Sequence, residues 1–285
     1  MNIEPEAVAE FELDAEALDV YDRKGFWLGP TVFDESEVRE LREAVIGTLN
    51  GQKDFDCMHW GLPPGRLDRG KIEYSKVGNA WWVNAVIRDT IKHPVIASIA
   101  SKLMRTDGVR LIHDQTIYKP GLGSAGETIV DSNIGWHQDA PHWTVFDTTV
   151  FTTAWISLQD TDEDNGGMRF VVGSHRWGMI EDAHTYGNKD LESLKQHFAT
   201  GRDWVEEPCV LKSGQVSFHS GLTFHGSGPN VTNEPRLCIA LNFMPDGTRY
   251  NKHGMYHQLG KIMGPYVRHG DLVGDPHFPL VWPNK

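Results

Sequence analysis

The chain has 285 residues, of which 39% are hydrophobic and 23% charged, and its formal net charge is −12. This composition is that of an ordinary globular protein, and no apolar run is long enough to cross a membrane. The negative charge argues against a nucleic-acid partner, which would require basic patches, and is compatible with a cationic or polar small-molecule substrate.

The first 16 residues and the cysteines predict a cytoplasmic protein. The N-terminal segment is acidic and lacks the basic start and apolar stretch of a signal peptide. Cys57, Cys209 and Cys238 are far apart and odd in number, which favours reduced structural thiols over disulfides or a metal site.

Residues 1–108 are expected to form a helical N-terminal part. Apolar residues at helical spacing, together with capping residues, predict helices at 14–24, 34–49 and 93–104, with a strand at 26–28. Gly25 is expected to end the first helix, and Asp34 or Ser36 to cap the second. Pro94 suits the first turn of the third helix.

From Val109 onward, short runs of β-branched and aromatic residues alternate with turn residues. They predict strands at 110–118, 134–138, 150–158, 168–172, 209–211, 215–219, 223–226 and 236–244. Many short strands indicate a mainly β protein with a jelly-roll or related barrel core and flanking helices. We expect a single domain over 1–285, with the barrel at 109–245, a lid-like insertion at 182–204 containing a helix at 190–198, and a C-terminal wrap at 246–285.

Two candidate metal ligands lie two residues apart in Gly135-Trp136-His137-Gln138-Asp139. In an extended strand, residues i and i+2 point to the same face, so this imidazole and this carboxylate are aimed at a common point. A second imidazole from another strand would complete a two-His-one-carboxylate set, which suits non-haem Fe(II) oxygen chemistry. The candidates for that imidazole are His113, His142, His175, His219 and His225.

Arg236 begins a strand with a clear two-residue alternation. Its face carries Cys238, Ala240 and Asn242, and the opposite face carries Leu237, Ile239, Leu241 and Phe243. We expect the bulky face to pack on helices and the face of Arg236 to line a cavity. A buried guanidinium requires an anion, which is either an internal Asp or Glu or the far carboxylate of a dicarboxylate cosubstrate.

Several motifs follow one another in a characteristic order. They are Trp136-His137-Gln138-Asp139, Asn165-Gly166-Gly167, Gly173-Ser174-His175, Gly214-Gln215-Val216-Ser217-Phe218-His219 and His225-Gly226-Ser227-Gly228-Pro229-Asn230, followed by Arg236. This ordered set resembles the phytanoyl-CoA dioxygenase family of Fe(II)- and 2-oxoglutarate-dependent oxygenases. Val172 departs from the pattern, because a proline often precedes Gly-Ser-His. The resemblance implies a double-stranded β-helix core, with Fe(II), 2-oxoglutarate and O2 as the reacting partners.

The resemblance also implies roles for particular residues. His137, Asp139 and His225 are expected to bind iron, and Arg236 to hold the distal carboxylate of 2-oxoglutarate. The family context favours His225 over His219, which is expected in the core or beside the ligands. Further cosubstrate contacts are expected from Ser227, Trp155, and Gln115 or Lys119.

The expected reaction is oxidation of an unactivated C–H bond, most simply hydroxylation, with release of succinate and CO2. Related halogenases have a small residue where this chain has Asp139, so the carboxylate indicates oxygenation. The sequence lacks a recognisable nucleotide site for coenzyme A, which favours a small metabolite or a natural product such as an antibiotic precursor. The candidate substrate contacts are Trp136, Trp143, His142 and Trp82, with core packing as the alternative for the tryptophans.

Two other functional classes remain open from the sequence. A cupin-like Zn or Mn hydrolase or isomerase would use a similar barrel without 2-oxoglutarate or an inward Arg236. A non-catalytic ligand-binding barrel would not require three convergent metal ligands.

Overall fold

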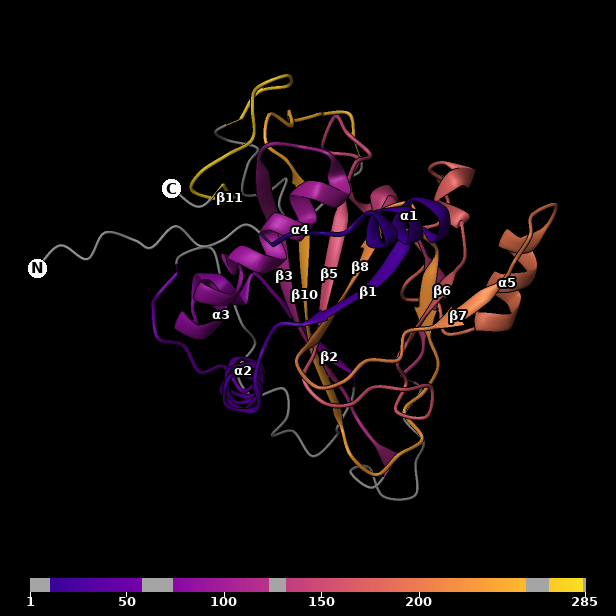
Figure 1. Ribbon diagram of the computed structural model, residues 1–285, viewed down its shortest axis with the longest axis horizontal. Coiled ribbons are helices and arrows are strands. Elements are labelled where there is room, and N and C mark those ends of the chain that lie inside the picture. Colours follow the sequence, from indigo (N-terminus) through magenta and orange to yellow (C-terminus); the bar gives the residue numbers. More distant parts are fainter. Residues whose placement is uncertain (1–10, 58–73, 123–131, 255–266, 284–285) are drawn as a thin grey trace, which may run out of the picture.

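Two antiparallel β-sheets form the centre of the molecule, and helices cover the outer side of the larger one (Figure 1). The computed structural model describes residues 11–57, 74–122, 132–254 and 267–283. The larger sheet has the strand order β1-β8-β5-β10-β3-β11, with β2 paired to β3. Its strands are β1 (Phe26–Thr31), β2 (Ser75–Gly78), β3 (Val109–Lys119), β5 (Thr152–Ser157), β8 (Gln215–Ser220), β10 (Arg236–Pro245) and β11 (Leu280–Trp282).

The smaller sheet packs against the inner face of the larger one. Its order is β4-β9-β6-β7, with β4 (Ile134–His137), β6 (Met168–Val171), β7 (Glu206–Pro208) and β9 (His225–Ser227). Phe26 of the larger sheet stacks on Phe170 of the smaller sheet with ring centroids 4.4 Å apart. The same inner cluster contains Trp155 and Cys238. Two facing antiparallel sheets confirm the predicted double-stranded β-helix core.

The helices of the N-terminal part follow their sequence signals. They are α1 (Ala15–Lys24), α2 (Glu35–Leu49), α3 (Ala85–Thr90) and α4 (Pro94–Met104). Asp34 caps α2 in a capping box with Glu37. Gly25 ends α1 with a φ of 84°, a conformation that glycine adopts without steric cost. The three predicted helices are therefore confirmed, and α3 is an addition.

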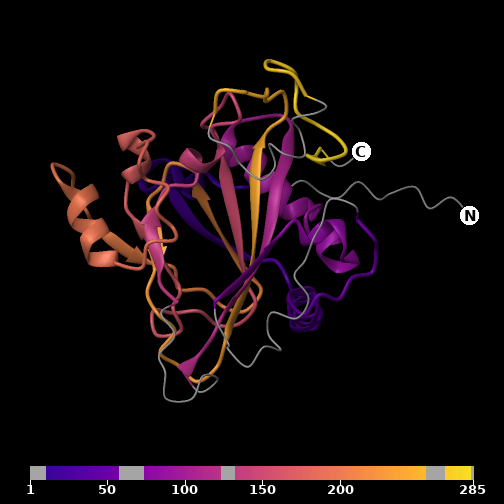
Figure 2. The ribbon, with the colours of Figure 1, turned by 180° about the vertical axis from the view of Figure 1, so that it is seen from behind.

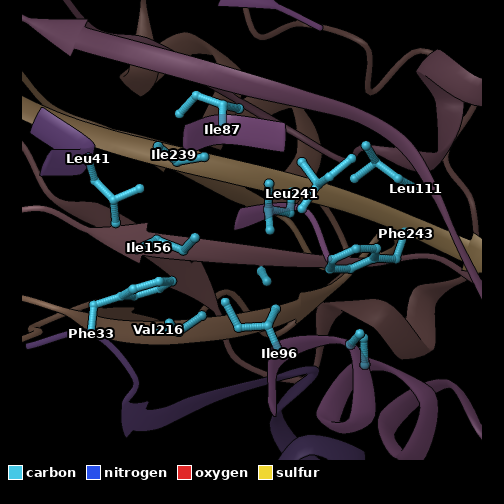
Figure 3. Close-up of a cluster of buried hydrophobic side chains, with 14 of the residues drawn as sticks. Phe33, Leu41, Ile87, Ile96, Leu111, Ile156, Val216, Ile239, Leu241 and Phe243 are labelled. Carbon is cyan, nitrogen blue, oxygen red and sulfur yellow. The ribbon is translucent and has the colours of Figure 1, made fainter. Parts of the chain in front are cut away.

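The bulky face of β10 packs on these helices, as its alternation predicts. Leu237, Ile239, Leu241 and Phe243 are fully buried in one cluster with side chains of α2, α3 and α4. Figure 3 shows Leu41 of α2, Ile87 of α3 and Ile96 of α4 around the middle strands of the sheet. Burial of this face fixes the register of β10, so the opposite face, which carries Arg236, must point into the barrel.

The predicted strand at 209–211 is wrong in position. The strand is β7, which pairs with β6 through Phe170↔Glu207 and Val171↔Glu206, whereas 209–211 makes one isolated bridge. The sequence pattern did not reveal β7, because Glu206 and Glu207 are polar and an edge strand of polar residues shows no apolar alternation. The short strands β2 and β11 were also missed, since runs of three or four residues carry too little pattern.

The insertion at 182–204 contains the predicted helix, α5 (Leu191–Ala199), whose N-cap is Asp190. Figure 2 shows α5 beside the smaller sheet, on the side away from α2 and α3. Part of the predicted C-terminal wrap, 255–266, lies outside the described residues. Of the helices that the structure describes, none is long and apolar enough to cross a membrane.

Candidate metal centre and cosubstrate pocket

Three predicted ligands meet where β4 and β9 pair. His137 is the last residue of β4 and His225 the first of β9, and they face each other in the antiparallel register. Asp139 follows two residues after His137, and its Oδ1 lies 3.8 Å from Nε2 of each histidine. One donor atom from each of the three residues lies within 4.8 Å of the others, so all three can bind a single ion.

Both imidazoles are oriented by the same local hydrogen bond. His137 Nδ1 lies 2.7 Å from the carbonyl oxygen of Gly135, and His225 Nδ1 lies 3.0 Å from that of Thr223. Because a carbonyl oxygen only accepts, each Nδ1 carries the proton and each Nε2 presents its lone pair toward Asp139. Such a bond from the second nitrogen is the usual support for a metal-binding histidine.

The electrostatic surroundings keep the three residues in the protonation state that a metal requires. Burial lowers the pKa of His137 well below its ordinary value and that of His225 to about 4. Burial raises the pKa of Asp139, but His225, His219 and His137 together bring it well below its ordinary value. Two neutral imidazoles and one carboxylate are the forms that bind a divalent cation.

The second oxygen of Asp139 is held from the larger sheet. Thr153 Oγ1 donates to Asp139 Oδ2 at 2.8 Å, and Asn242 Nδ2 donates to Thr153 Oγ1 at 2.7 Å. His219 Nε2 lies 3.3 Å from the same carboxylate oxygen. His219 therefore lies beside the ligand set, as expected, and the other carboxylate oxygen is left facing the two imidazoles.

Arg236 lies in the inner part of the barrel with its side chain almost fully buried. Its Nη1 donates to Cys238 Sγ at 3.1 Å, and its guanidinium carbon lies 5.2 Å from the ring centroid of Trp155. Among the residues that the structure describes, none forms a hydrogen bond with its Nε, and no Asp or Glu forms an ion pair with this side chain. Within the described part of the chain, the internal carboxylate considered for Arg236 is not found, so an external carboxylate fits this position.

A second buried cation lies next to Arg236. Lys119 of β3 is its cross-strand partner and is 0% exposed. Its Nζ donates to Ser227 Oγ at 2.7 Å and to the carbonyl oxygen of Gly228 at 2.6 Å. Arg236, Lys119 and Ser227 therefore form one polar cluster, in which two cations favour a bound anion.

The Asn165-Gly166-Gly167 motif forms a wall of this cluster. Gly166 has a φ of 72°, and a Cβ there would lie 2.8 Å from Lys119 Cδ and 3.0 Å from the carbonyl oxygen of Gly228. The motif therefore requires glycine both for its backbone conformation and for the close approach to Lys119.

The remaining predicted polar residues lie in three different places. The His142 ring is 6.1 Å from that of His137. Gln115 is in register with Ala240 on β10, and its Nε2 lies 3.0 Å from His113 Nε2. Of the two candidates on β3, Lys119 is therefore the one beside Arg236. His175 lies elsewhere, with Nε2 3.0 Å from the carbonyl oxygen of Asp22.

The structure places the three predicted substrate tryptophans in apolar clusters. Trp136 alternates with His137 and points to the other side of β4, where its ring lies 5.2 Å from that of Trp204. Trp143 and Trp82 are buried in a second cluster with Phe151. The positions of these three rings are explained by packing in the hydrophobic core, which was the alternative to substrate contact.

Two residues near the site were given no role from the sequence, although Gln138 belongs to the Trp136-His137-Gln138-Asp139 motif. Tyr186 of the insertion lies 6.1 Å from His137, ring to ring. Gln138 is fully buried and joins the loops around the site, donating to the carbonyl oxygens of Gly178 and Leu222 and accepting from Ile180 N. These partners are distant in sequence, so the WHQD motif alone could not reveal them.

The insertion is held against β4 by backbone hydrogen bonds. Gly135 N donates to the carbonyl oxygen of Tyr186 at 3.0 Å, and Gln138 N donates to that of Ala183 at 3.0 Å. A Cβ on Gly135 would lie 2.3 Å from the carbonyl oxygen of Thr185, so glycine permits this approach. This contact brings Tyr186 to the metal centre.

A β-helix core that combines a two-His-one-carboxylate set with a cationic pocket defines the class of non-haem iron oxygenases that use an oxo-acid cosubstrate. The profile of the phytanoyl-CoA dioxygenase family matches residues 21–238. The chain therefore belongs to the phytanoyl-CoA dioxygenase family, and it is an Fe(II)- and 2-oxoglutarate-dependent dioxygenase.

Relatives agree with this assignment, and a solved structure agrees with the fold. The ectoine dioxygenase of Nocardia farcinica is 26% identical over 249 residues, covering 81% of this chain and 78% of the relative. The probable alpha-ketoglutarate-dependent hypophosphite dioxygenase of Stutzerimonas stutzeri is 30% identical, covering 80% and 78%. The crystal structure of the carbocyclase SnoK from nogalamycin biosynthesis has a TM-score of 0.70 at 23% identity, covering 94% of this chain and 96% of SnoK, and confirms the fold.

Proposed function

We propose that His137, Asp139 and His225 hold Fe(II), and that the enzyme hydroxylates an unactivated C–H bond of a small metabolite or natural product. In this proposal, Arg236 binds the distal carboxylate of 2-oxoglutarate with help from Lys119. This proposal rests on two features of one barrel. Three donor atoms converge, and no described residue forms a hydrogen bond with Nε of the buried Arg236 guanidinium.

When bound, Fe(II) and 2-oxoglutarate supply an O2-dependent oxidation that releases succinate and CO2. The protein orients these groups. Arg236 and Lys119 attract the distal carboxylate, Ser227 supplies a hydroxyl beside it, and the ring of Trp155 shields the guanidinium from water. Thr153 keeps the carboxylate of Asp139 turned toward the histidines. Asp139 also fills the third protein position, which favours oxygenation over halogenation.

Comparisons with relatives support a small substrate. The methylphosphonate hydroxylase of Gimesia maris is 25% identical over 79% of this chain and 78% of that protein. Its name, like those of the ectoine and hypophosphite dioxygenases, refers to a small polar molecule. SnoK is described as a carbocyclase from nogalamycin biosynthesis, which supports the natural-product alternative.

An absorption spectrum tests the site assignment. Adding Fe(II) and 2-oxoglutarate to the metal-free protein without oxygen should produce the weak visible charge-transfer band of chelated cosubstrate. A Zn or Mn hydrolase and a non-catalytic barrel would show no such band. In this experiment, Arg236→Met should weaken the band at a given 2-oxoglutarate concentration. Arg39→Met, on the exposed side of α2, is the matched control and should leave the band unchanged. A spectrum that stays unchanged on addition of both ligands contradicts the proposal.

Isotope labelling tests the reaction outcome. With a substrate found by screening for stimulated 2-oxoglutarate turnover, ¹⁸O2 should label both succinate and product if the enzyme hydroxylates. Label in succinate alone would indicate desaturation, ring closure or epimerisation by the same site, and would contradict hydroxylation.

A further inference from the structure

Aromatic and imidazole side chains gather on the side of the metal centre where β4 ends. The His142 ring is 6.1 Å from His137 and 6.1 Å from His184. The Tyr186 ring is 5.8 Å from His142 and 6.1 Å from His137. His142 comes from the 3-10 turn Ala140–Trp143 after Asp139, whereas His184 and Tyr186 come from the insertion.

A lysine joins this group from the larger sheet. Lys76 of β2 is in register with Ile117, which faces Cys238 across β3 and β10, so its side chain shares the inner face of the sheet. Its Nζ lies 4.3 Å from the ring centroid of Tyr186. We name Lys76, His142, His184 and Tyr186 the donor cluster, because each can donate a hydrogen bond.

The charges of the donor cluster act on one another and on the metal site. Burial lowers the pKa of His142, Asp139 raises it, and His184 and Lys76 lower it. Burial also lowers the pKa of Lys76, and Asp139 raises it. The ring distances of 6.1 Å from His142 and from Tyr186 to His137 place a molecule bound at the cluster next to the metal ligands.

One buried nitrogen atom of the donor cluster is available to bind a ligand. His142 Nε2 is buried, and no described residue forms a hydrogen bond with it. A buried polar nitrogen without a partner is destabilising unless something binds it. Tyr186 is 39% exposed, so the cluster opens to solvent and a small molecule can enter.

We propose that the donor cluster binds an anionic group of the primary substrate, a carboxylate or a phosphonate, and so holds its C–H bond beside the iron. The inference rests on the proposed function of the metal centre. The net charge of −12 suggested a cationic substrate, but a lysine and two imidazoles at the site favour the opposite sign. Local donors, rather than net charge, determine which group is bound at short range.

The donor cluster is separate from the pocket proposed for the distal carboxylate of 2-oxoglutarate. Ser227 of that pocket is in register with Ile134 at the start of β4, whereas His142 follows the other end of the strand. The two sites therefore lie toward opposite ends of the β4–β9 pair, with the metal ligands between them.

Binding of small probes to the anaerobic enzyme, saturated with Fe(II) and 2-oxoglutarate, tests the inference. Methylphosphonate and propionate are the anionic probes, and propionamide and propylammonium the neutral and cationic ones. Calorimetry should give dissociation constants about tenfold or more lower for the anions, because a charge-assisted hydrogen bond is the stronger kind. The anions should also perturb the charge-transfer band, which reports on the iron. Equal affinity for all four probes would overturn the inference.

Variants locate the bound anion. Lys76→Met and His142→Phe should each weaken methylphosphonate binding about tenfold. Lys92→Met, an exposed lysine between α3 and α4, should leave it unchanged. The charge-transfer band shows that each variant is folded and loaded. If Lys76→Met instead weakens 2-oxoglutarate and spares methylphosphonate, Lys76 serves the cosubstrate and the inference fails. Absence of the band in the unaltered protein would instead overturn the metal assignment.

Discussion

The two sides of the metal centre are built differently. On the proposed cosubstrate side, Arg236, Lys119 and Ser227 lie on three strands and are at most 3% exposed. On the substrate side, the donor cluster combines one short strand with a turn and an inserted segment, and Tyr186 is 39% exposed. The side that would bind a common cosubstrate is thus fixed by sheet register, whereas the side that would select a substrate depends on connecting segments, which vary most readily.

Asp139→Ala should have the largest effect, because this carboxylate lies between the two sides. Loss of a metal ligand should lower iron affinity at least about 100-fold, and abolish substrate-coupled succinate formation. Iron titration and succinate analysis are the measurements. Asp19→Ala, an exposed carboxylate of α1, is the control. Full turnover in Asp139→Ala would disprove the ligand assignment.

Arg236→Met should weaken 2-oxoglutarate binding without changing iron binding. Removing one partner of a buried charged pair should raise the KM for 2-oxoglutarate about 100-fold, because Lys119 would be left to hold the carboxylate. Iron affinity should stay within about twofold of its original value, since Arg236 does not contact the triad. Steady-state kinetics at varied 2-oxoglutarate measures this. An unchanged KM would mean that the cosubstrate binds elsewhere.

Thr153→Val should have a moderate effect that reaches both sides through Asp139. The substitution preserves side-chain shape but removes the 2.8 Å hydrogen bond to Oδ2, so iron affinity should fall about tenfold. Thr153→Ser should restore most of it. Competition with a chelator measures the affinity. Equal affinities in both variants and the original protein would show that the hydroxyl does not position Asp139.

Tyr186→Ala should have the smallest effect and should be confined to the substrate side. Opening the site to water should raise the ratio of succinate to oxidised product about two- to threefold, while the KM for 2-oxoglutarate stays constant. Quantifying both products from the same reaction gives this ratio. A change in the KM for 2-oxoglutarate without uncoupling would contradict the division between the two sides.

The sequence predicted most of the fold where residue patterns were long. The alternation of β10 correctly placed Leu237 against the helices and turned Arg236 inward. The edge strand β7 was misplaced because Glu206 and Glu207 conceal it, and β2 was too short to recognise. Apolar alternation is clear only where a whole face of a strand is buried, so edge strands and short terminal strands are difficult to predict from sequence.

Two candidate ligands were also accessible from sequence, because His137 and Asp139 share one strand end and a strand period of two fixes their common direction. The preference for His225 as the third ligand came from the family resemblance. That Lys119 lies directly opposite Arg236 was not accessible, since it depends on the register between β3 and β10. The tryptophan positions needed the structure for a similar reason. Whether an aromatic ring faces the site or the core depends on which neighbouring element covers it.

By itself, the sequence indicated the barrel, the His137–Asp139 pair and the inward Arg236, because short strands, local periodicity and the cost of burying a charge predict them. Only the tertiary structure brought Tyr186 and Lys76 beside His142, and Thr153 beside Asp139. These contacts join segments far apart in the chain, and sequence spacing contains no information about such distances until the sheets have folded. The proposed substrate side of the metal centre is therefore a property of the fold.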